Sequence, residues 1–383
     1  MMLKVINVVG ARPNFMKMAP IIEAMNRYPD RFQHRLVHTG QHYDARMSQS
    51  FFLDLGMPKP DVDLEVGSGS HAEQTARVMV EFEKVCCRER PDLVIVVGDV
   101  NSTMACAITA KKLGIRVAHV EAGLRSRDMS MPEEINRLCT DVLCDYLFTT
   151  DHFANENLSA EGIPPDRVFF VGNVMIDTLV KHRELARGAG LSARWGLEHG
   201  RYATLTLHRP SNVDDSRTLR GILEALAEVA TEIPIIFPIH PRTKKMVEQF
   251  GLGAHCSRAP KPEGLWITEP LGYLDFLHLN MHAMMVITDS GGLQEEATVL
   301  GVPCITLRNN TERPITCEMG TNCIVGNDRE RILGQARKVL RGEVARGKVP
   351  EKWDGRAADR IVDILATRAR SSAPADADRI LVS

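Results

Sequence analysis

The sequence contains no apolar run approaching the roughly 20 residues needed to cross a bilayer as a helix. Its first residues, MMLKVINVVGARP, lack the regions of a signal peptide and are typical of a strand followed by a turn. We therefore expect a soluble, cytoplasmic protein with no membrane partner.

An excess of charge of one sign and ordered cysteine spacing are absent as well. A formal net charge of -2 and a pI near 6.7 give no electrostatic reason to expect nucleic acid as a partner. The 9 cysteines have no paired CxxC spacing. We expect them to be reduced, mostly buried thiols, and we expect no metal site.

Short β-branched runs alternate with helical segments through both halves of the 383 residues, without a repeat in the sequence itself. This alternation predicts an α/β fold with two doubly wound, Rossmann-like domains facing across a cleft. We place the first domain at 1–172, joined by a C-terminal helix at 355–370, and the second at 173–354. The polar, glycine-containing stretch 188–200 is the strongest linker signal, and we place the domain boundary at roughly 172–190.

Carboxylates gather in the first half. Asp99 and Glu121 follow two apolar runs, 93–97 and 115–120, which predict neighbouring buried strands. Glu133, Glu134 and Arg137 lie on the next predicted helix. Acids at such positions often cap helices, but these come from three separate elements and should meet at the ligand-binding edge of the sheet. Crowding should raise at least one carboxylate pKa toward a value useful for proton transfer.

The first predicted strand, 4–9, turns through Gly10 to Asn14 into a helix expected to begin near Phe15. Arg12 and Lys17 flank this turn, which is neither a Walker loop nor GxGxxG. A helix N-terminus beside cationic side chains suits an anion, although a surface Arg and Lys are the ordinary interpretation.

In the second half, TDSGGLQEEA follows a predicted strand. Asp289 and Ser290 should start a helix whose free amides a phosphate can approach closely, because Gly291 and Gly292 carry no side chain. An ordinary capped helix is the alternative. Further candidates for the same ligand follow in sequence: Glu295 and Glu296 for the hydroxyls of a ribose, and Arg313.

Two His-Arg pairs occupy equivalent strand ends in TLHR and IHPR. His208 and Arg209 follow the first strand of the second half, and His240 and Arg242 follow the second. Together the two pairs indicate an anionic ligand between the domains.

In combination, the motifs GARPNFMKMAPI, HTGQHYD, VGDVNST, HVEAGLRS, MPEEINR, TLHR, IHPRT, GYLDF, TDSGGLQEEA and TERP resemble the non-hydrolysing UDP-N-acetylglucosamine 2-epimerases, which have the glycosyltransferase-B fold. The resemblance covers roughly residues 3–365. It implies interconversion of UDP-N-acetylglucosamine and UDP-N-acetylmannosamine through a 2-acetamidoglucal, without a metal or nicotinamide cofactor. It also implies a homodimer.

The resemblance carries roles to matching positions. The catalytic set it implies comprises the carboxylates Asp99, Glu121 and Glu133 together with Lys17 and His208. Contacts to UDP and the sugar are implied for Arg12, Arg137, Ser290, Gly291, Gly292, Glu296 and Arg313, and Phe276 matches the segment that holds the uracil. Our own expectation is that Glu121 and Asp99 act on opposite faces of C2.

Two departures concern specificity. Many relatives read HRxEN after the catalytic histidine, whereas this chain has Ser211 before Asn212. Bacterial relatives read QHRxM or similar where His42 is followed here by Tyr43 and Asp44. In some relatives this region binds a second, activating UDP-N-acetylglucosamine, so this departure bears on allosteric activation.

Other activities remain open on the sequence alone. The same epimerisation of a UDP-2,3-diacetamido uronic acid is the nearest. Glycosyl transfer would not need three carboxylates beside the sugar. A hydrolysing epimerase and a non-catalytic sugar-nucleotide sensor are further alternatives.

Overall fold

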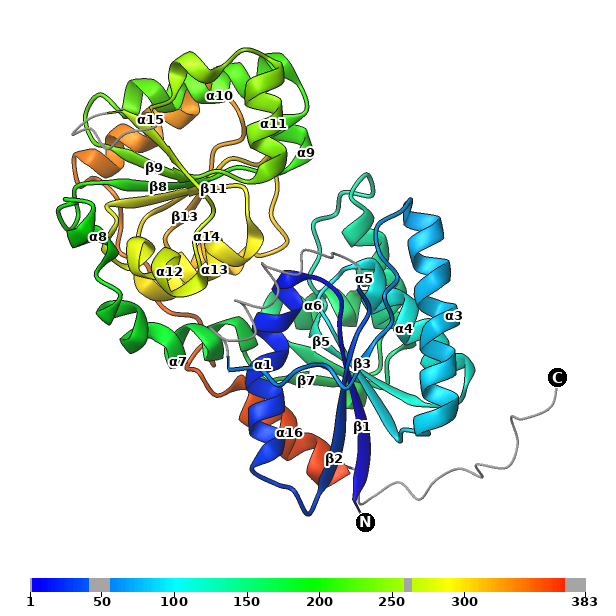
Figure 1. Cartoon of the computed structure of the whole chain (residues 1–383). Helices are drawn as coiled ribbons and strands as arrows, with labels where there is room; N and C mark the ends of the chain where they lie inside the picture. The colour runs from blue at the N-terminus through cyan, green and yellow to red at the C-terminus, as the bar shows by residue number, and fades with distance from the viewer. Residues whose placement is uncertain (1, 41–55, 258–263, 369–383) are drawn as a thin grey trace. The chain divides into compact units, whose positions relative to one another are not determined.

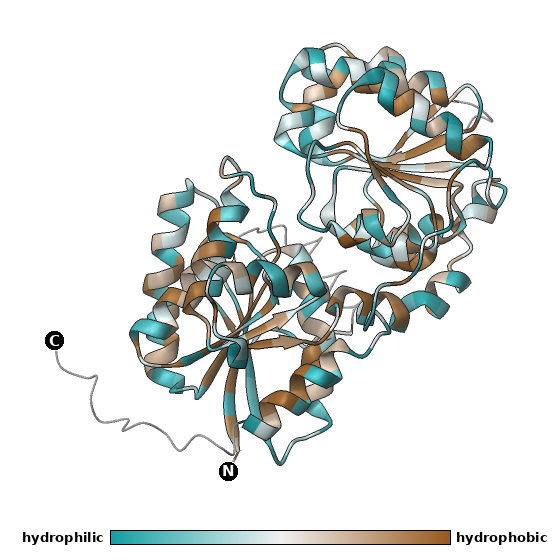
Figure 2. Cartoon of the chain, turned by 180° about the vertical axis from the view of Figure 1, so that it is seen from behind, coloured by the Kyte–Doolittle hydropathy of each residue, from teal (hydrophilic) through white to brown (hydrophobic). Residues whose placement is uncertain are grey.

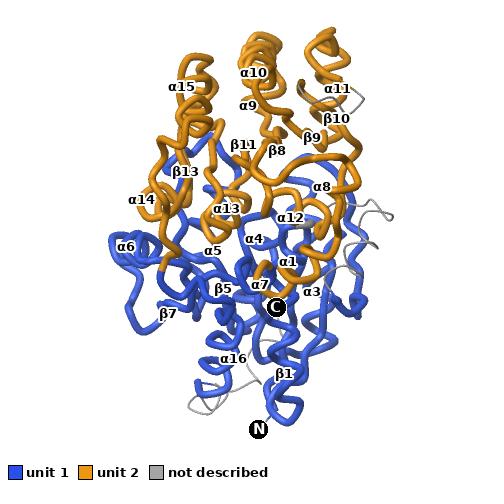
Figure 3. Tube along the Cα trace, turned by 90° about the vertical axis from the view of Figure 1, so that its left-hand side faces the viewer, with its two compact units in different colours: residues 1–178, 351–383 blue, residues 179–350 orange. Residues whose placement is uncertain are grey.

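The computed structural model describes residues 2–40, 56–257 and 264–368. The chain divides into two compact units (Figure 3), unit 1 with residues 1–178 and 351–383 and unit 2 with residues 179–350. Each unit contains a parallel sheet with flanking helices (Figure 1), as the alternating pattern predicts. No helix within the described ranges has the length and apolar composition needed to span a membrane.

Unit 1 is built on a seven-stranded sheet in the order β3-β2-β1-β4-β5-β6-β7. Its strands are β1 (Leu3–Val9), β2 (Phe32–His38), β3 (Val62–Asp63), β4 (Leu93–Val97), β5 (Arg116–Ala122), β6 (Tyr146–Thr149) and β7 (Val168–Phe170). The strand order reverses between β1 and β4. The carboxyl ends of these two strands therefore flank a switch point, where open α/β sheets bind ligands.

The helices of unit 1 cover both faces of this sheet. They are α1 (Arg12–Asn26), α3 (His71–Glu89), α4 (Asn101–Lys112), α5 (Pro132–Leu143), α6 (His152–Ala160), the first part of α7 (Val174–Gly188), α16 (Ala357–Arg368) and the 3-10 turn η1 (Pro165–Arg167). Helices α3, α4 and α5 pack side by side, and α1 packs on α16. The strands are mostly apolar, with polar residues on the outer sides of the helices (Figure 2), and β4 is buried at all five positions because helices cover it on both sides.

Unit 2 repeats this topology with the order β10-β9-β8-β11-β12-β13. Its strands are β8 (Ala203–Thr206), β9 (Ile235–Pro238), β10 (Leu265–Thr268), β11 (Met285–Thr288), β12 (Cys304–Thr306) and β13 (Asn322–Ile324). Its helices are the remainder of α7, α8 (Leu191–Arg194), α9 (Pro210–Val213), α10 (Ser216–Val229), α11 (Pro241–Gln249), α12 (Tyr273–His282), α13 (Gly291–Leu300), α14 (Ile315–Glu318), α15 (Arg329–Leu340) and the 3-10 turn η2 (Gly253–His255). Here the switch point lies between β8 and β11.

Two local predictions are wrong. Helix α1 begins at Arg12 and not near Phe15, because Pro13 suits the first helical turn and the Asn14 side chain accepts hydrogen bonds from the amides of Gly10 and Ala11. Residues 188–200 are not a linker, since Leu191 lies in an apolar core cluster of unit 2. The division between the units falls inside α7, after Thr178, which lies within the expected boundary of roughly 172–190.

Candidate active site

The two carboxylates predicted at strand ends differ in backbone position. Asp99 follows β4 after Gly98, as expected. Glu121 lies inside β5 and not beyond its end, with a left-handed φ of 69°. The pairing of β5 with β6 shifts register between Val120 and Ala122, so Glu121 occupies a bulge. A positive φ at a residue with a long side chain costs free energy and is found most often at functional sites.

Lys17 reaches Glu121 from helix α1. The ammonium and the carboxylate form a buried ion pair, with side chains 8% and 2% exposed. A Cβ added to Gly98 would lie 3.2 Å from the Lys17 ammonium and 3.8 Å from a Glu121 carboxylate oxygen. The backbone after β4 therefore runs directly beside the pair, and the glycine makes room for it.

Arg137 joins Asp99 to helix α5. Its Nη1 lies 2.5 Å from Oδ2 of Asp99, and its Nη2 lies 2.6 Å from Oε2 of Glu134. Glu134 also accepts hydrogen bonds from the amides of Ser126 and Arg127, at 2.9 and 2.8 Å. Burial opposes the charge of Glu134, but these bonds and Arg137 outweigh it and lower its pKa. This direction is opposite to the one expected from crowding. Glu134 therefore anchors Arg137, whereas the Asp99 side chain stays 27% exposed.

Glu133 precedes this anchor in the first turn of α5 and is partly buried. Arg12 is the first residue of α1, but its side chain lies outside the described residues, as does all of His42. Asn14 donates to the carbonyl oxygen of Val97 at 2.9 Å and accepts from Gly10 and Ala11. Part of the predicted anion site at this helix start is therefore occupied by the protein itself.

Two residues that the sequence reading missed hold the Gly98-Asp99 backbone. Asn136 donates to the carbonyl oxygen of Asp99 at 2.8 Å. His119 is fully buried, with Nε2 2.8 Å from the carbonyl oxygen of Gly98 and Nδ1 2.6 Å from Asp141. His119 precedes Glu121 by two positions in HVEAG, on the strand predicted to end at the site. This position could have identified His119 as a residue of the site.

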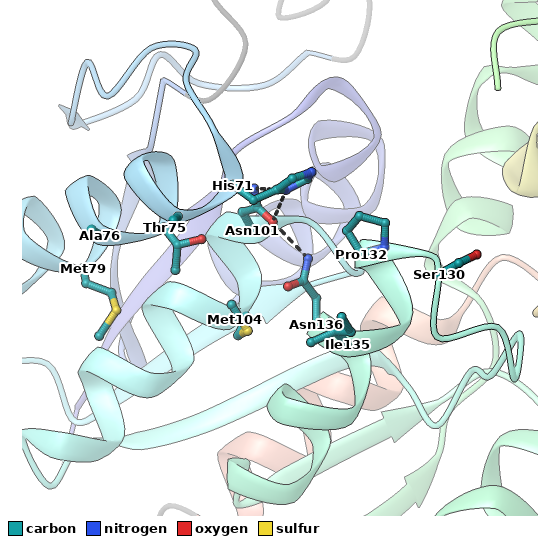
Figure 4. Close-up of a pocket in the computed structure, with 11 residues that line it drawn as sticks. His71, Thr75, Ala76, Met79, Asn101, Met104, Ser130, Pro132, Ile135 and Asn136 are labelled. Carbon is teal, nitrogen blue, oxygen red and sulfur yellow. Dashed lines mark hydrogen bonds between the residues drawn. The ribbon is translucent and has the colours of Figure 1, made fainter. Parts of the chain in front are cut away.

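A pocket of about 540 Å³ lies among α3, α4 and α5 (Figure 4). His71, Asn101 and Asn136 form a hydrogen-bonded row along it, and Met79 and Ile135 are among its apolar lining. None of the predicted site residues lines it. Its connection to the carboxylates is the Asn136 side chain, which also holds Asp99.

In unit 2, His208 and Asp289 meet at the switch point between β8 and β11. Asp289 is completely buried and accepts hydrogen bonds from the amides of His208 and Arg209, at 2.9 and 2.7 Å. Its Oδ1 lies 2.9 Å from Nδ1 of His208. Burial opposes ionisation, but the bonds from His208 and the two amides outweigh it and lower the pKa of Asp289.

The two predicted histidines of unit 2 are brought together. The His208 side chain is 38% exposed, and its ring centroid lies 5.8 Å from that of His240. Arg242 does not join them through its guanidinium, which pairs with Asp214 instead.

Helix α13 begins where the sequence predicts, with Ser290 as the N-cap and Gly291 and Gly292 in the first turn. Arg313 packs against this turn, because a Cβ added to Gly291 would lie 2.5 Å from Nη1 of Arg313. Nε of Arg313 is 2.6 Å from Glu295. Glu295 therefore faces Arg313.

Glu296, one of the predicted site residues, is a carboxylate with a raised pKa. Burial raises the pKa of Glu296 to about 7, nearby Glu295 adds to the rise, and a hydrogen bond of 3.1 Å from the Tyr273 hydroxyl opposes it. Tyr273 was missed, although it opens the GYLDF motif. Phe276 follows it on α12, partly buried against the apolar cluster that contains Leu191. Among the described residues no group of three or more His, Cys, Asp or Glu side chains is arranged to hold a metal ion.

Comparison with known proteins identifies relatives over almost the whole chain. The sequence profile described as UDP-N-acetylglucosamine 2-epimerase matches residues 23–366. The UDP-N-acetylglucosamine 2-epimerase of Methanocaldococcus jannaschii is 42% identical over 94% of this chain and 97% of the relative. The UDP-2,3-diacetamido-2,3-dideoxy-D-glucuronate 2-epimerase of Pseudomonas aeruginosa is 39% identical over 95% of this chain and 99% of the relative.

A crystal structure of the M. jannaschii enzyme in complex with UDP-GlcNAc and UDP has a TM-score of 0.88, covering 95% of this chain and 100% of that one. The fold and the sequence therefore agree along the chain, in both units. This chain belongs to the UDP-N-acetylglucosamine 2-epimerase family, whose members are isomerases.

Proposed function

We propose that the protein interconverts UDP-N-acetylglucosamine and UDP-N-acetylmannosamine by inverting C2 of the sugar. The observation that carries this proposal is the pair of carboxylates on adjacent strands of one sheet. Asp99 after β4 and Glu121 in β5 are each held by a cation from a different helix, Arg137 and Lys17. Two separately held carboxylates suit a reaction that removes a proton from one face of a carbon and returns one to the other.

The chemistry follows from the substrate. The C2 hydrogen is not acidic while C1 bears its diphosphate, so it leaves as the C1–O bond breaks. The C2–H electron pair forms the C1–C2 double bond, and UDP departs with the electrons of the C1–O bond. In the return step a proton adds to the opposite face of C2 while a phosphate oxygen of UDP bonds to C1. We assign the two faces to Glu121 and Asp99, with Glu133 as a further acid or base.

Negative charge accumulates on the departing diphosphate, so cations and amide donors near it accelerate the elimination. In unit 2 we assign this task to His208, His240, Arg313 and the α13 start at Ser290, Gly291 and Gly292. Phe276 and Glu296 are assigned to the uridine. In unit 1, Arg12 and Lys17 complete the set.

Proton NMR of the purified protein with UDP-N-acetylglucosamine in deuterated water tests the proposal. Deuterium at C2, with UDP-N-acetylmannosamine appearing and little free sugar, is the expected result. Asp99→Asn, Glu121→Gln and Glu133→Gln should each slow exchange at least about 100-fold. Glu228→Gln, which breaks surface pairs with Arg329 and Arg337 in unit 2, is the matched control and should leave the rate unchanged. An inert substrate would contradict the assignment.

A second candidate is the same epimerisation of UDP-2,3-diacetamido-2,3-dideoxy-D-glucuronate, favoured by the P. aeruginosa relative at 39% identity. Its substrate carries an additional carboxylate, and this chain departs from many relatives at Ser211. Both nucleotide sugars should be compared at equal concentration. Faster C2 exchange with the uronate would select this candidate.

The family resemblance also implies a homodimer. Sedimentation velocity at micromolar concentration should give about twice the chain mass of 42.6 kDa. A monomeric species at that concentration would contradict this part of the proposal.

A further inference from the structure

We propose that Asp289 is a positioning residue that fixes the tautomer of His208, so that Nε2 of the imidazole faces the departing diphosphate. That a diphosphate departs beside His208 rests on the proposed function, whereas the assignment of the tautomer does not. Asp289 lies 2.9 Å from Nδ1 of His208 and has no contact assigned to the substrate.

The geometry leaves the carboxylate little freedom. Asp289 is fully buried, its Oδ2 accepts from the amides of His208 and Arg209, and Asn212 donates to the same oxygen at 3.3 Å. Asn212 is itself fixed by a hydrogen bond of 2.8 Å to the carbonyl oxygen of Leu307. The carboxylate is therefore held through its Oδ2, and its Oδ1 lies 2.9 Å from Nδ1 of His208.

An ionised carboxylate can only accept a hydrogen bond, and Oδ1 of Asp289 lies 2.9 Å from Nδ1, so we place the His208 proton on Nδ1. The neutral ring then carries its lone pair on Nε2, and the protonated ring carries a donor there. In either form Nε2 is the ring nitrogen that does not face Asp289, and the His208 side chain is 38% exposed. Holding the ring in this form removes the need to rotate or re-protonate it during each turnover.

His240 provides a contrast within the same structure. Its Nδ1 accepts a hydrogen bond from the backbone amide of Arg242, at 3.2 Å, because His240 is the N-cap of α11. When neutral, this ring must carry its proton on Nε2. Two histidines whose ring centroids lie 5.8 Å apart are thus expected in opposite tautomers.

Nitrogen-15 NMR of the full protein labelled at histidine, recorded without ligand at alkaline pH, tests the assignment, because the tautomers differ in their ring nitrogen shifts. His208→Gln and His240→Gln assign the signals. His208 should show a protonated Nδ1 and His240 a protonated Nε2. A protonated Nε2 on His208 would overturn the proposal, and this measurement needs no variant of Asp289.

Asp289→Asn tests the cause. An amide at this position can accept from the two backbone amides while its NH2 group donates to Nδ1, so the His208 proton should move to Nε2. The turnover number should fall about 100-fold to 10,000-fold with KM within about threefold of the wild type. Asn212→Ser, which loosens the same carboxylate without facing the imidazole, should keep the wild-type tautomer.

An unchanged His208 tautomer in Asp289→Asn would overturn the proposal. If the wild-type protein does not epimerise UDP-N-acetylglucosamine but His208 carries its proton on Nδ1, the proposed substrate is wrong and the positioning by Asp289 is supported.

Discussion

The buried pair between Lys17 and Glu121 makes a prediction that can be worked through quantitatively. Lys17→Met retains the length of the side chain but removes the ammonium, leaving a carboxylate only 2% exposed without it. Breaking a buried ion pair by removing one partner costs about 3–5 kcal/mol, because the remaining charge is no longer compensated. In the double variant Lys17→Met/Glu121→Gln, the loss of unfolding free energy should be about 1–3 kcal/mol smaller than the sum of the losses in the two single variants.

Unit 1 can be followed by itself because the three tryptophans are unevenly placed. Trp353 is buried in unit 1 and donates to the carbonyl oxygen of Thr150 at 3.0 Å. Trp195 and Trp266 lie in unit 2, with ring centroids 5.1 Å apart. Replacing these two by phenylalanine leaves Trp353 fluorescence as the probe of unit 1 in urea titrations.

The matched control for Lys17→Met is Lys111→Met. Lys111 pairs with Asp145 at 2.8 Å in the same unit, but both side chains are about one third exposed. An exposed pair contributes at most about 1 kcal/mol. Equal losses for the two variants, or strict additivity between Lys17→Met and Glu121→Gln, would refute the claim that burial makes the first pair strong.

Two further outcomes are expected. Burial raises the pKa of Asp177, which accepts from the amides of Ala357 and Ala358, to about 6. This folded-state pKa lies above the unfolded value of about 4. The contribution of Asp177 to the free energy of unfolding is therefore fully present below pH 4 and is lost as pH rises through 6. Asp177→Asn should remove that slope from the Trp353 urea midpoints, and an unaltered slope would contradict it. Gly291→Ala places a Cβ where Arg313 packs and should weaken UDP binding about tenfold by calorimetry, a loss of about 1.4 kcal/mol. Gly221→Ala, in helix α10 with open space around its Cβ, should leave UDP affinity unchanged. Equal effects of the two alanines would exclude the Arg313 contact as the cause.

Much of the fold could be predicted because buried parallel strands leave a simple trace in the sequence. The run at 93–97 is β4 without adjustment, since all five side chains are buried and apolar. The run at 285–288 is β11, where all four residues are buried and the first three are apolar. Short edge strands such as β3 and β13 carry too few apolar residues to be recognised. The stretch 188–200 was wrongly predicted as a linker because its glycines and charges are typical of one. A single buried apolar residue, Leu191, is too little to indicate a packed segment.

The placement of site residues followed from strand ends, but their partners did not. In the sequence, Glu134 and Asp289 look like helix-capping acids. In the structure, both accept hydrogen bonds from backbone amides of other segments. Glu134 binds the amides of Ser126 and Arg127, and Asp289 binds a segment 81 residues away. Nothing in local spacing distinguishes such an acid from a cap, because both accept backbone N–H groups with the same geometry.

This distinction bears on which carboxylates can do chemistry. A carboxylate whose oxygens are saturated by amides and a guanidinium, such as Glu134, is held in its ionised form and cannot exchange a proton without losing those bonds. Asp99 has its Oδ2 against Arg137 but keeps 27% of its side chain exposed, so it is oriented and still accessible, as the proposed role requires. Glu133 is adjacent to Glu134 on α5, yet the two side chains leave the helix about 100° apart, which separates the anchor from the neighbouring acid. Glu134→Gln should therefore act indirectly, by releasing Arg137 and with it the orientation of Asp99.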